Sequence, residues 1–281
     1  MRWVNMQVEA GFSWPDRLVE FPFEGKRVVL QPRTETLAST ASMYDESDTS
    51  FEDGGSALSR FLSCLAWSRD ESLEDLWAMG SNDPSTPGRI GHGGRQTSNW
   101  AAVEPWHIVY LPKVSDPKAA LALALYREGM GLRSAPLAFL SFFKVLNILH
   151  DKGAPQKAWI NSVLNRVVYD PAAARLAEVR ASHSDVGSYL WEQGRCAVAH
   201  ANSASVNPDD YADKRRLWED LRLMKELAAL FIEAELKVER EGTFLARIRD
   251  SRDDQPQLFA QNGVENGRVV YAPARRSMGT R

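Results

Sequence analysis

The chain has 281 residues, a length that suggests two domains or one large domain. Hydrophobic residues make up 44% and charged residues 25%, and the net charge is −3, values typical of a globular protein with a real core. This balance excludes nucleic-acid binding through overall positive charge, so any such site must be a local basic patch.

Cysteine usage and hydropathy indicate a cytoplasmic protein. The two cysteines, Cys64 and Cys196, lie far apart in the sequence and offer neither a disulfide framework nor the spacing of a zinc site. The N-terminus lacks a basic region followed by an apolar run, so no signal peptide is expected. No apolar stretch approaches ~20 residues, and we therefore expect no membrane-spanning helix.

The N-terminal part, residues 1–112, is predicted to be rich in β-strands. Short alternating apolar runs between residues 3 and 44 are separated by Pro and Gly, the pattern of antiparallel hairpins. An acidic, turn-rich break is expected over 45–55, followed by a short helix over 57–67 with Leu58, Phe61, Leu62 and Leu65 on one face. A long loop over 80–99 and a last strand over 106–111 complete this prediction.

Residues 116–240 are predicted to form an all-helical bundle, so that the fold class is α+β. The run from Lys118 to Glu128 is apolar on most faces and is expected to be a buried central helix. Pro136 and Pro171 suit the first turn of two further helices, while Asp210 suits the N-cap of another. Six helices with short connections indicate a bundle. The Phe139, Phe142 and Phe143 stripe belongs to its core.

The C-terminal tail, residues 241–281, carries a weaker pattern. Asn266-Gly267 stands ahead of the run RVVY and resembles a hairpin turn. Such a hairpin could return a strand to the N-terminal part.

The stretch YLWEQGRCAVAHA, residues 189–201, carries the residues most suited to chemistry. It places Arg195 and His200 five positions apart near the end of the fifth helix, which begins after Ser184 or Asp185. At ~100° per residue these two side chains would lie roughly 140° apart around an ideal helix. Either the helix unwinds before His200, or a second subunit completes the site.

This Arg-x4-His motif in a helical bundle resembles the HEPN (higher eukaryotes and prokaryotes nucleotide-binding) superfamily. More narrowly, LYREGMGLRSAPLAFLSFFKVLN (125–147) together with GRCAVAHA (194–201) looks like the methylamine-utilisation protein J family of bacteria. The resemblance covers about residues 116–240. It implies a dimer formed along the fifth helix, and it favours completion of the site across that dimer.

Active HEPN proteins cut RNA without a metal, and the resemblance implies the roles of the matching residues. His200 would be the acid/base for attack by a 2′-hydroxyl, and Arg195 would bind the phosphate. Arg127 and Lys144 are candidates for further phosphate contacts, although Arg127 also suits an interhelical hydrogen bond and Lys144 a side chain extending out of the apolar helix. Cys196 departs from the family pattern, in which Asn, His or Asp usually follows the arginine.

A non-enzymatic alternative fits the same residues. Arg195 would pair with Glu192, and His200 would be a histidine favoured by the dipole at a helix C-terminus. The chain would then be a dimeric accessory protein of the methylamine-utilisation type.

The remaining patterns point to no other site. The glycine-rich run 88–96 contains Arg89, His92 and Arg95, but it lacks the strand and Gly-Lys-Ser/Thr of nucleotide-binding loops and is predicted to be a flexible loop. The five histidines are scattered, so we expect no metal and no cofactor. No serine or cysteine stands in the setting of a catalytic nucleophile.

Overall fold

The computed structural model describes residues 3–44, 50–83, 86–91, 106, 108–200, 206–207, 209–248, 259–265 and 268–273. The chain divides into two compact units. The first, here called the sheet unit, consists of Met1–Lys113 and Arg240–Arg281; the second, the helical unit, is Val114–Glu239. Strands in one unit and helices in the other confirm the predicted α+β class.

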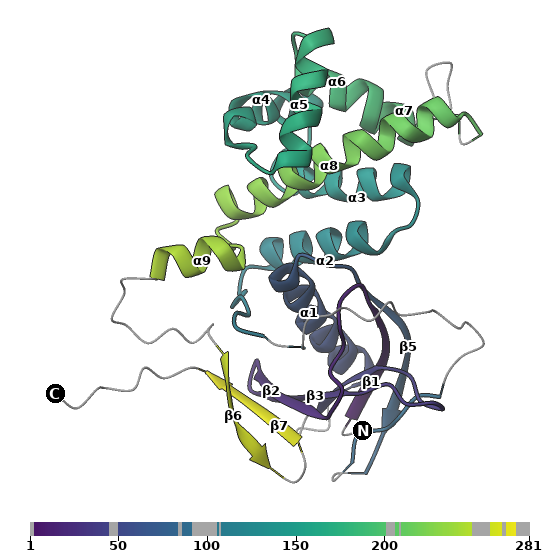
Figure 1. Ribbon diagram of the computed structural model, residues 1–281, viewed down its shortest axis with the longest axis vertical. Helices are drawn as coiled ribbons and strands as arrows, with labels where there is room; N and C mark the ends of the chain where they lie inside the picture. The colour runs from purple at the N-terminus through teal and green to yellow at the C-terminus, as the bar shows by residue number, and fades with distance from the viewer. Residues whose placement is uncertain are drawn as a thin grey trace, which may run out of the picture. The chain divides into compact units, whose positions relative to one another are not determined.

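The sheet unit is built on one sheet in which both ends of the chain take part (Figure 1). In the described residues its seven strands have the order β5-β1-β4-β3-β2-β7-β6. Neighbours are antiparallel except for β2 and β7, which are parallel. The strands are β1 (Trp3–Ala10), β2 (Val19–Phe23), β3 (Lys26–Gln31), β4 (Thr40–Tyr44), β5 (Leu73–Ser81), β6 (Phe259–Glu265) and β7 (Arg268–Pro273).

The predicted antiparallel sheet over residues 3–44 is therefore confirmed, and helix α1 (Phe51–Arg69) covers it (Figure 1). The predicted apolar stripe of α1 is fully buried, at 0% exposure for Leu58, Phe61, Leu62 and Leu65. Ser50 caps the helix by accepting a hydrogen bond from the Asp53 N–H.

Two local predictions for this unit were wrong, and two elements were missed; residues 45–49 of the predicted break lie outside the described residues. The acidic segment 51–55 opens α1 rather than forming a break, because carboxylates in a first turn favour the helix dipole. Strand β5 was missed since most of its positions are exposed and carry no apolar alternation. Residues 108–111 form no named strand, although the Val109 carbonyl accepts a 2.7 Å hydrogen bond from the Phe259 N–H. Helix α9 (Glu241–Ile248) was also not predicted.

The C-terminal tail joins the sheet instead of standing apart. Strands β6 and β7 form an antiparallel pair, and β7 lies beside β2 through the pairs Val19–Val269 and Glu20–Val270. The tail therefore does return a strand to the N-terminal part. The predicted turn at Asn266-Gly267 falls outside the described residues.

The helical unit contains the predicted series of helices, and no strand occurs in its described residues between 118 and 200. Helix α8, and not the predicted α2, is central, because α2, α3, α4, α5 and η2 all pack against it. Phe139, Phe142 and Phe143 are core residues, as predicted. The elements are α2 (Pro117–Gly131), α3 (Ala135–Asn147), α4 (Gly153–Val163), η1 (Leu164–Arg166), α5 (Asp170–Ser182), α6 (Val186–Tyr189), η2 (Leu190–Cys196), α7 (Ala197–Ala199) and α8 (Tyr211–Ala234).

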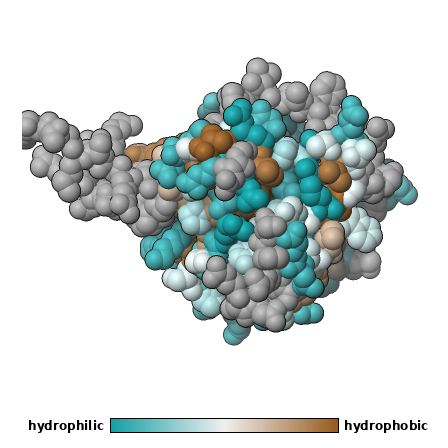
Figure 2. Space-filling model, turned by 90° about the horizontal axis from the view of Figure 1, so that it is seen from below, coloured by the Kyte–Doolittle hydropathy of each residue, from teal (hydrophilic) through white to brown (hydrophobic). Residues whose placement is uncertain are grey.

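The surface seen in Figure 2 is mostly hydrophilic, with hydrophobic residues in separate small groups among the residues that are coloured. In the described residues, no helix combines the length and the apolar character that crossing a membrane requires.

Candidate active site at the end of a π-helical segment

The predicted fifth helix is one continuous rod of three parts, α6, η2 and α7. Asp185 starts it as the N-cap, since its carboxylate accepts the Ser188 N–H at 2.8 Å, and hydrogen bonds from Asn161 and Ser188 lower the pKa of this carboxyl. The middle part, η2, is π-helical, a rare form in which residue i bonds to residue i+5 and which is frequent at functional sites. The Ala197 N–H closes it by bonding to the Glu192 carbonyl.

Two glycines let this rod lie very close to its neighbours. A Cβ atom at Gly194 would stand 2.4 Å from the ring of Phe139 on α3, and one at Gly187 would stand 2.4 Å from the carbonyl oxygen of Lys157 on α4. A side chain at Gly187 would collide with the backbone of α4, and one at Gly194 would require the buried Phe139 ring to move. The packing of the π-helical segment therefore depends on glycine.

The structure brings Arg195 and His200 together within one chain. Arg195 Nη1 lies 3.3 Å from His200 Nε2, and it also lies 3.7 Å from the Cys196 sulfur. The rod ends at His200, whose φ of −125° and ψ of 121° are those of extended backbone. A wide π turn followed by this end replaces the ideal helix that would have kept the two side chains apart. Unwinding within one chain is thus sufficient, and a second subunit is not needed for the contact.

The N–H groups of Arg195 determine which role His200 Nε2 has in this contact. A guanidinium has donors and no acceptor, so His200 Nε2 must accept and the contact requires an imidazole that is unprotonated at Nε2. Within the described residues, Nη1 is the single Arg195 nitrogen in a protein hydrogen bond. His200 is exposed and Arg195 is half-buried, so both can be reached from solvent.

One further cation, Lys157, shares the ring of Trp191 with Arg195. The half-buried ring of Trp191 on η2 lies beneath two cations, with Lys157 Nζ 5.3 Å and the Arg195 guanidinium carbon 5.9 Å from its centroid. Gly153, the first residue of α4, lies against the same ring, where a Cβ atom would stand 2.6 Å from it. Among the described carboxylates none forms an ion pair with Lys157 or Arg195.

The helical unit also contains a buried charged network centred on Asp220 of α8. The side chain is 0% exposed and accepts hydrogen bonds from Arg175 Nε at 2.9 Å, from the Tyr189 hydroxyl at 3.0 Å and from Arg216 Nη1 at 3.2 Å. Arg175 also binds Glu178 at 2.8 Å. Three helices are thereby joined through one carboxylate.

Burial and charge act in opposite directions on this network. Burial raises the pKa of the Asp220 carboxyl, while the hydrogen bonds and charges of Arg175, Tyr189 and Arg216 oppose that shift. Burial, with the Asp220 charge second, raises the pKa of the Tyr189 phenol as well. The pKa of Arg175 is raised by Glu178 and Asp220 despite the opposing effect of its own burial. The arginine therefore stays charged inside the bundle.

Arg216 connects the network to the π-helical segment. The same Nη1 atom that contacts Asp220 donates a 2.9 Å hydrogen bond to the carbonyl oxygen of Gln193, two residues before Arg195. Widening of a helix changes which carbonyls find partners, and this one is satisfied by a side chain from α8. Asp220 and Arg216 thus hold the backbone from which Arg195 extends.

The other predicted site residues do not join the pair. Arg127 on α2 is half-buried and Lys144 on α3 is exposed, and no contact in the described residues links either to Arg195 or His200. The exposure of Lys144 fits a side chain that extends out of its helix. Glu192, expected as an ion-pair partner of Arg195, is not among the contacts of that arginine.

The alternative anion and metal sites gain no support from the structure. The Arg89 Nη2 atom donates a 2.7 Å hydrogen bond to the Pro32 carbonyl, and Gly91 forms a bridge with Leu37, while His92 and Arg95 lie outside the described residues. No three His, Cys, Asp or Glu side chains gather at metal-binding distances among the residues that the structure describes.

Fold and site together define a helical bundle that carries an accessible arginine–histidine pair. Residues 122–233 match the family described as Methylamine utilization protein MauJ, a stretch that runs from α2 to α8 and includes Arg195, His200 and Asp220. No curated protein and no solved structure matches the chain. The match supports the methylamine-utilisation part of the predicted resemblance for this stretch.

Sequence reasoning missed the Asp220 network and the π-helical geometry. The network had a visible signal, since Asp220 follows Arg216 by four positions on a helix whose other inward positions are apolar. An acidic residue inside an apolar stripe demands a buried partner. The π segment had none except Gly194 within a helix, which costs about 1 kcal/mol unless packing requires it.

Proposed function

We propose that the helical unit is an RNA-directed module that cleaves RNA without a metal, using Arg195 and His200. One observation supports this proposal: the contact of 3.3 Å between Arg195 Nη1 and His200 Nε2 at an accessible position of the helical unit. An acid/base group beside a guanidinium is what phosphodiester transfer needs.

In the proposed reaction, a phosphate of the RNA binds the guanidinium of Arg195. The hydrogen bond from Arg195 to His200 Nε2 is thereby broken, and Nε2 becomes available as a base. Nε2 then accepts the proton of the 2′-hydroxyl, whose oxygen forms a bond to phosphorus while the bond from phosphorus to the 5′-oxygen breaks. The leaving 5′-oxygen takes a proton from the imidazolium or from water. The products are a 2′,3′-cyclic phosphate and a 5′-hydroxyl. The planar guanidinium stabilises the charge that develops on the phosphate oxygens.

The test is cleavage of structured and unstructured RNA by the full-length chain, with and without EDTA. His200→Ala is expected to lower the rate by about 10²–10⁴-fold. Arg195→Ala should lower the rate similarly. Arg195→Lys should retain little activity, because an ammonium group cannot replace the two hydrogen bonds that a guanidinium donates to a phosphate. Arg180→Ala changes an exposed arginine in the same unit and should remain active. A fully active His200→Ala, loss of activity with EDTA, or cleavage of a strand that lacks 2′-hydroxyls would overturn the mechanism.

A second candidate function is favoured by the family match and by Cys196. In this case the helical unit is a non-catalytic, dimeric accessory module of methylamine metabolism. Exposed Leu121, Leu137 and Trp218 on α2, α3 and α8, at 52%, 52% and 55% exposure, would suit assembly. Failure of the wild-type chain to cleave any RNA, together with a dimer mass by light scattering, would favour this function over the first.

A further inference from the structure

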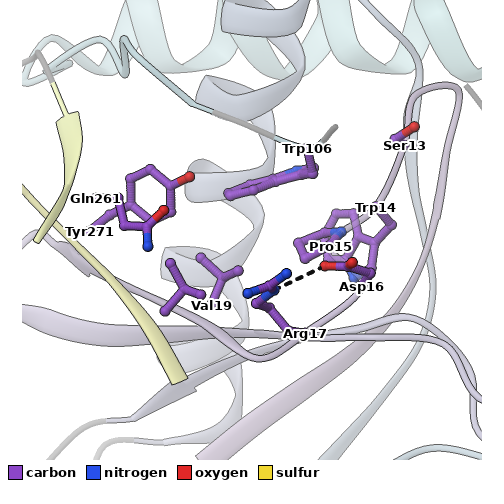
Figure 3. Close-up of a pocket in the computed structure, with 10 residues that line it drawn as sticks. Ser13, Trp14, Pro15, Asp16, Arg17, Val19, Trp106, Gln261 and Tyr271 are labelled. Carbon is purple, nitrogen blue, oxygen red and sulfur yellow. Dashed lines mark hydrogen bonds and ion pairs between the residues drawn. The ribbon is translucent and has the colours of Figure 1, made fainter. Parts of the chain in front are cut away.

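A pocket of about 350 Å³ lies in the sheet unit, away from the residues of the proposed nuclease site in sequence and in unit (Figure 3). It lies where the loop after β1 meets strands β2, β6 and β7. Aromatic side chains supply much of its wall, namely Trp14, Trp106 and Tyr271, and three polar residues, Asp16, Arg17 and Gln261, lie among them. Ligand pockets typically combine such apolar walls with a few polar groups that fix orientation.

The aromatic walls are held in place by their own contacts. The indole N–H of Trp14 donates a 3.0 Å hydrogen bond to the Gln31 carbonyl. The rings of Trp106 and Tyr271 meet edge to face, with centroids 5.6 Å apart and an interplanar angle of 90°. Phe21 stacks on Tyr271 at 4.8 Å. Rings fixed in this way offer a flat ligand a preformed surface at little entropic cost.

Arg17 of the pocket can bind a charged group of a ligand. Arg17 Nε contacts Asp16 at 3.3 Å, as Figure 3 shows, but the two side chains are 63% and 84% exposed. An ion pair this exposed is weak. The Arg17 guanidinium can therefore release the Asp16 carboxylate and bind an anionic group of a ligand instead. A guanidinium can donate two parallel hydrogen bonds to a phosphate. Gln261 adds an amide that both donates and accepts.

We propose that this pocket binds a single nucleotide, with its base against the aromatic side chains and its phosphate at Arg17. Aromatic rings accept any base face, and the Gln261 amide can meet a base edge. The volume is near the lower end of ligand pockets, which suits one nucleotide and not a dinucleotide. A small organic cation is disfavoured by Arg17. The nucleotide could be free or an unpaired unit of an RNA strand.

Calorimetric titration of the full-length chain tests the proposal. The ligands are AMP and UMP, adenosine, ribose 5-phosphate, inorganic phosphate and a four-nucleotide oligoribonucleotide. Both mononucleotides should bind, adenosine and ribose 5-phosphate should bind more weakly, and phosphate should not bind measurably. Tighter binding of the oligoribonucleotide would identify a strand as the source, and equal or weaker binding would identify the free nucleotide. Binding of phosphate as strong as that of AMP, or binding of methylammonium in its place, would overturn the proposal.

Variants separate the pocket from general surface effects. Trp14→Ala should weaken AMP binding roughly 5- to 150-fold, the range for loss of one base–aromatic contact. Trp77→Ala removes an indole 69% exposed on β5, at the opposite edge of the sheet from β6, and should change nothing. Arg17→Gln should weaken AMP but not adenosine, whereas Arg33→Gln makes the same charge change without that selectivity.

Two further measurements keep the result interpretable. Gln261→Ala lies at an exposed position of β6 and leaves the core intact, so its loss of affinity is measurable even if Trp14→Ala unfolds. His200→Ala should bind AMP like the wild type, because its position belongs to the other unit. Nucleotide binding without RNA cleavage would leave this inference standing and the nuclease proposal refuted. Unchanged affinity in both Trp14→Ala and Gln261→Ala would refute the pocket.

Discussion

The sheet unit and the helical unit each hold an arginine against a carboxylate through two nitrogens, and the two pairs differ in burial. In the sheet unit, Arg60 of α1 meets Glu24 at 2.8 Å and 3.4 Å with side chains 43% and 36% exposed. In the helical unit, Arg175 meets Asp220 at 2.9 Å from two nitrogens, with side chains 14% and 1% exposed. Water screens the first pair and hardly reaches the second. The same chemistry therefore has a peripheral role in one unit and a central role in the other.

The difference also separates what each unit uses to hold its shape. The sheet unit buries mainly apolar and aromatic side chains, such as Trp3, Phe21 and Phe61. The helical unit adds a buried charged network that ends at the backbone of the π-helical segment. A site that depends on one hydrogen-bonding nitrogen needs such directional support, because apolar packing alone does not fix a backbone carbonyl.

The largest expected effect is that of Asp220→Ala. Removing the carboxylate leaves the Arg175 charge buried without its main partner, which typically costs 3–5 kcal/mol. Protection from hydrogen exchange should fall in α5 and α8 while the strands β1 to β4 keep theirs. Asp220→Asn preserves part of the hydrogen bonding and should lose less. A loss below about 1 kcal/mol for Asp220→Ala, which is the usual range of an exposed pair, would erase the contrast between the units.

The next effect compares two helical glycines. Gly194→Ala forces a Cβ atom to 2.4 Å from the Phe139 ring, and overpacking of this kind typically costs 1–3 kcal/mol. Gly242→Ala on α9 meets nothing within 4 Å and should stabilise the sheet unit by about 0.5–1 kcal/mol through helix propensity. Chemical denaturation of both variants measures whether each substitution lowers or raises the free energy of unfolding. If Gly194→Ala were also stabilising, the close approach of η2 to α3 would be wrong.

These glycines also show where sequence reasoning succeeds and where it ends. Apolar periodicity predicted the bundle helices, the stripe of α1 and the strands over 3–44, because burial repeats every 3.6 or 2 residues. It failed for β5, whose positions are mostly exposed. The hairpin pattern of the tail did predict a strand returning to the N-terminal part, but it could not identify β2 as the partner of β7, because this pairing joins residues about 250 apart in the sequence. The contact of Arg195 with His200 depends on a π turn, and periodicity alone predicts an ideal helix.

A smaller effect is the pH dependence of stability that the buried Cys64 is expected to cause. Burial raises the pKa of the Cys64 thiol from 9.0 to about 12, so the folded chain holds this proton more tightly than the unfolded chain. Stability from this group is complete below pH 9 and falls as the pH rises toward 12. Between pH 8 and 10 the loss is about 1.4 kcal/mol. Subtracting the pH profile of Cys64→Ala from that of the wild type isolates the slope.

The control for this measurement is Cys196, which is half-exposed. Cys196→Ser should leave the slope in place, and a thiol reagent should label Cys196 in the native chain and Cys64 after unfolding. Identical pH profiles for the wild type and Cys64→Ala would show that water reaches the thiol beneath α1.

The smallest effect is expected at the exposed pair. Glu24 lies with Gly25 in the tight turn between β2 and β3, where both residues have positive φ, so the backbone holds the carboxylate in reach of Arg60. The hydrogen bond to Glu24 raises the pKa of Arg60, which therefore stays charged at every practical pH. A double-mutant cycle of Arg60→Ala and Glu24→Ala should give a coupling of about 0.2–1 kcal/mol, reduced further in 1 M salt. The same cycle on Arg175 and Asp220 should give a larger coupling with little salt dependence, because solvent ions cannot enter the bundle. Couplings of equal size would mean that burial does not separate the two units after all.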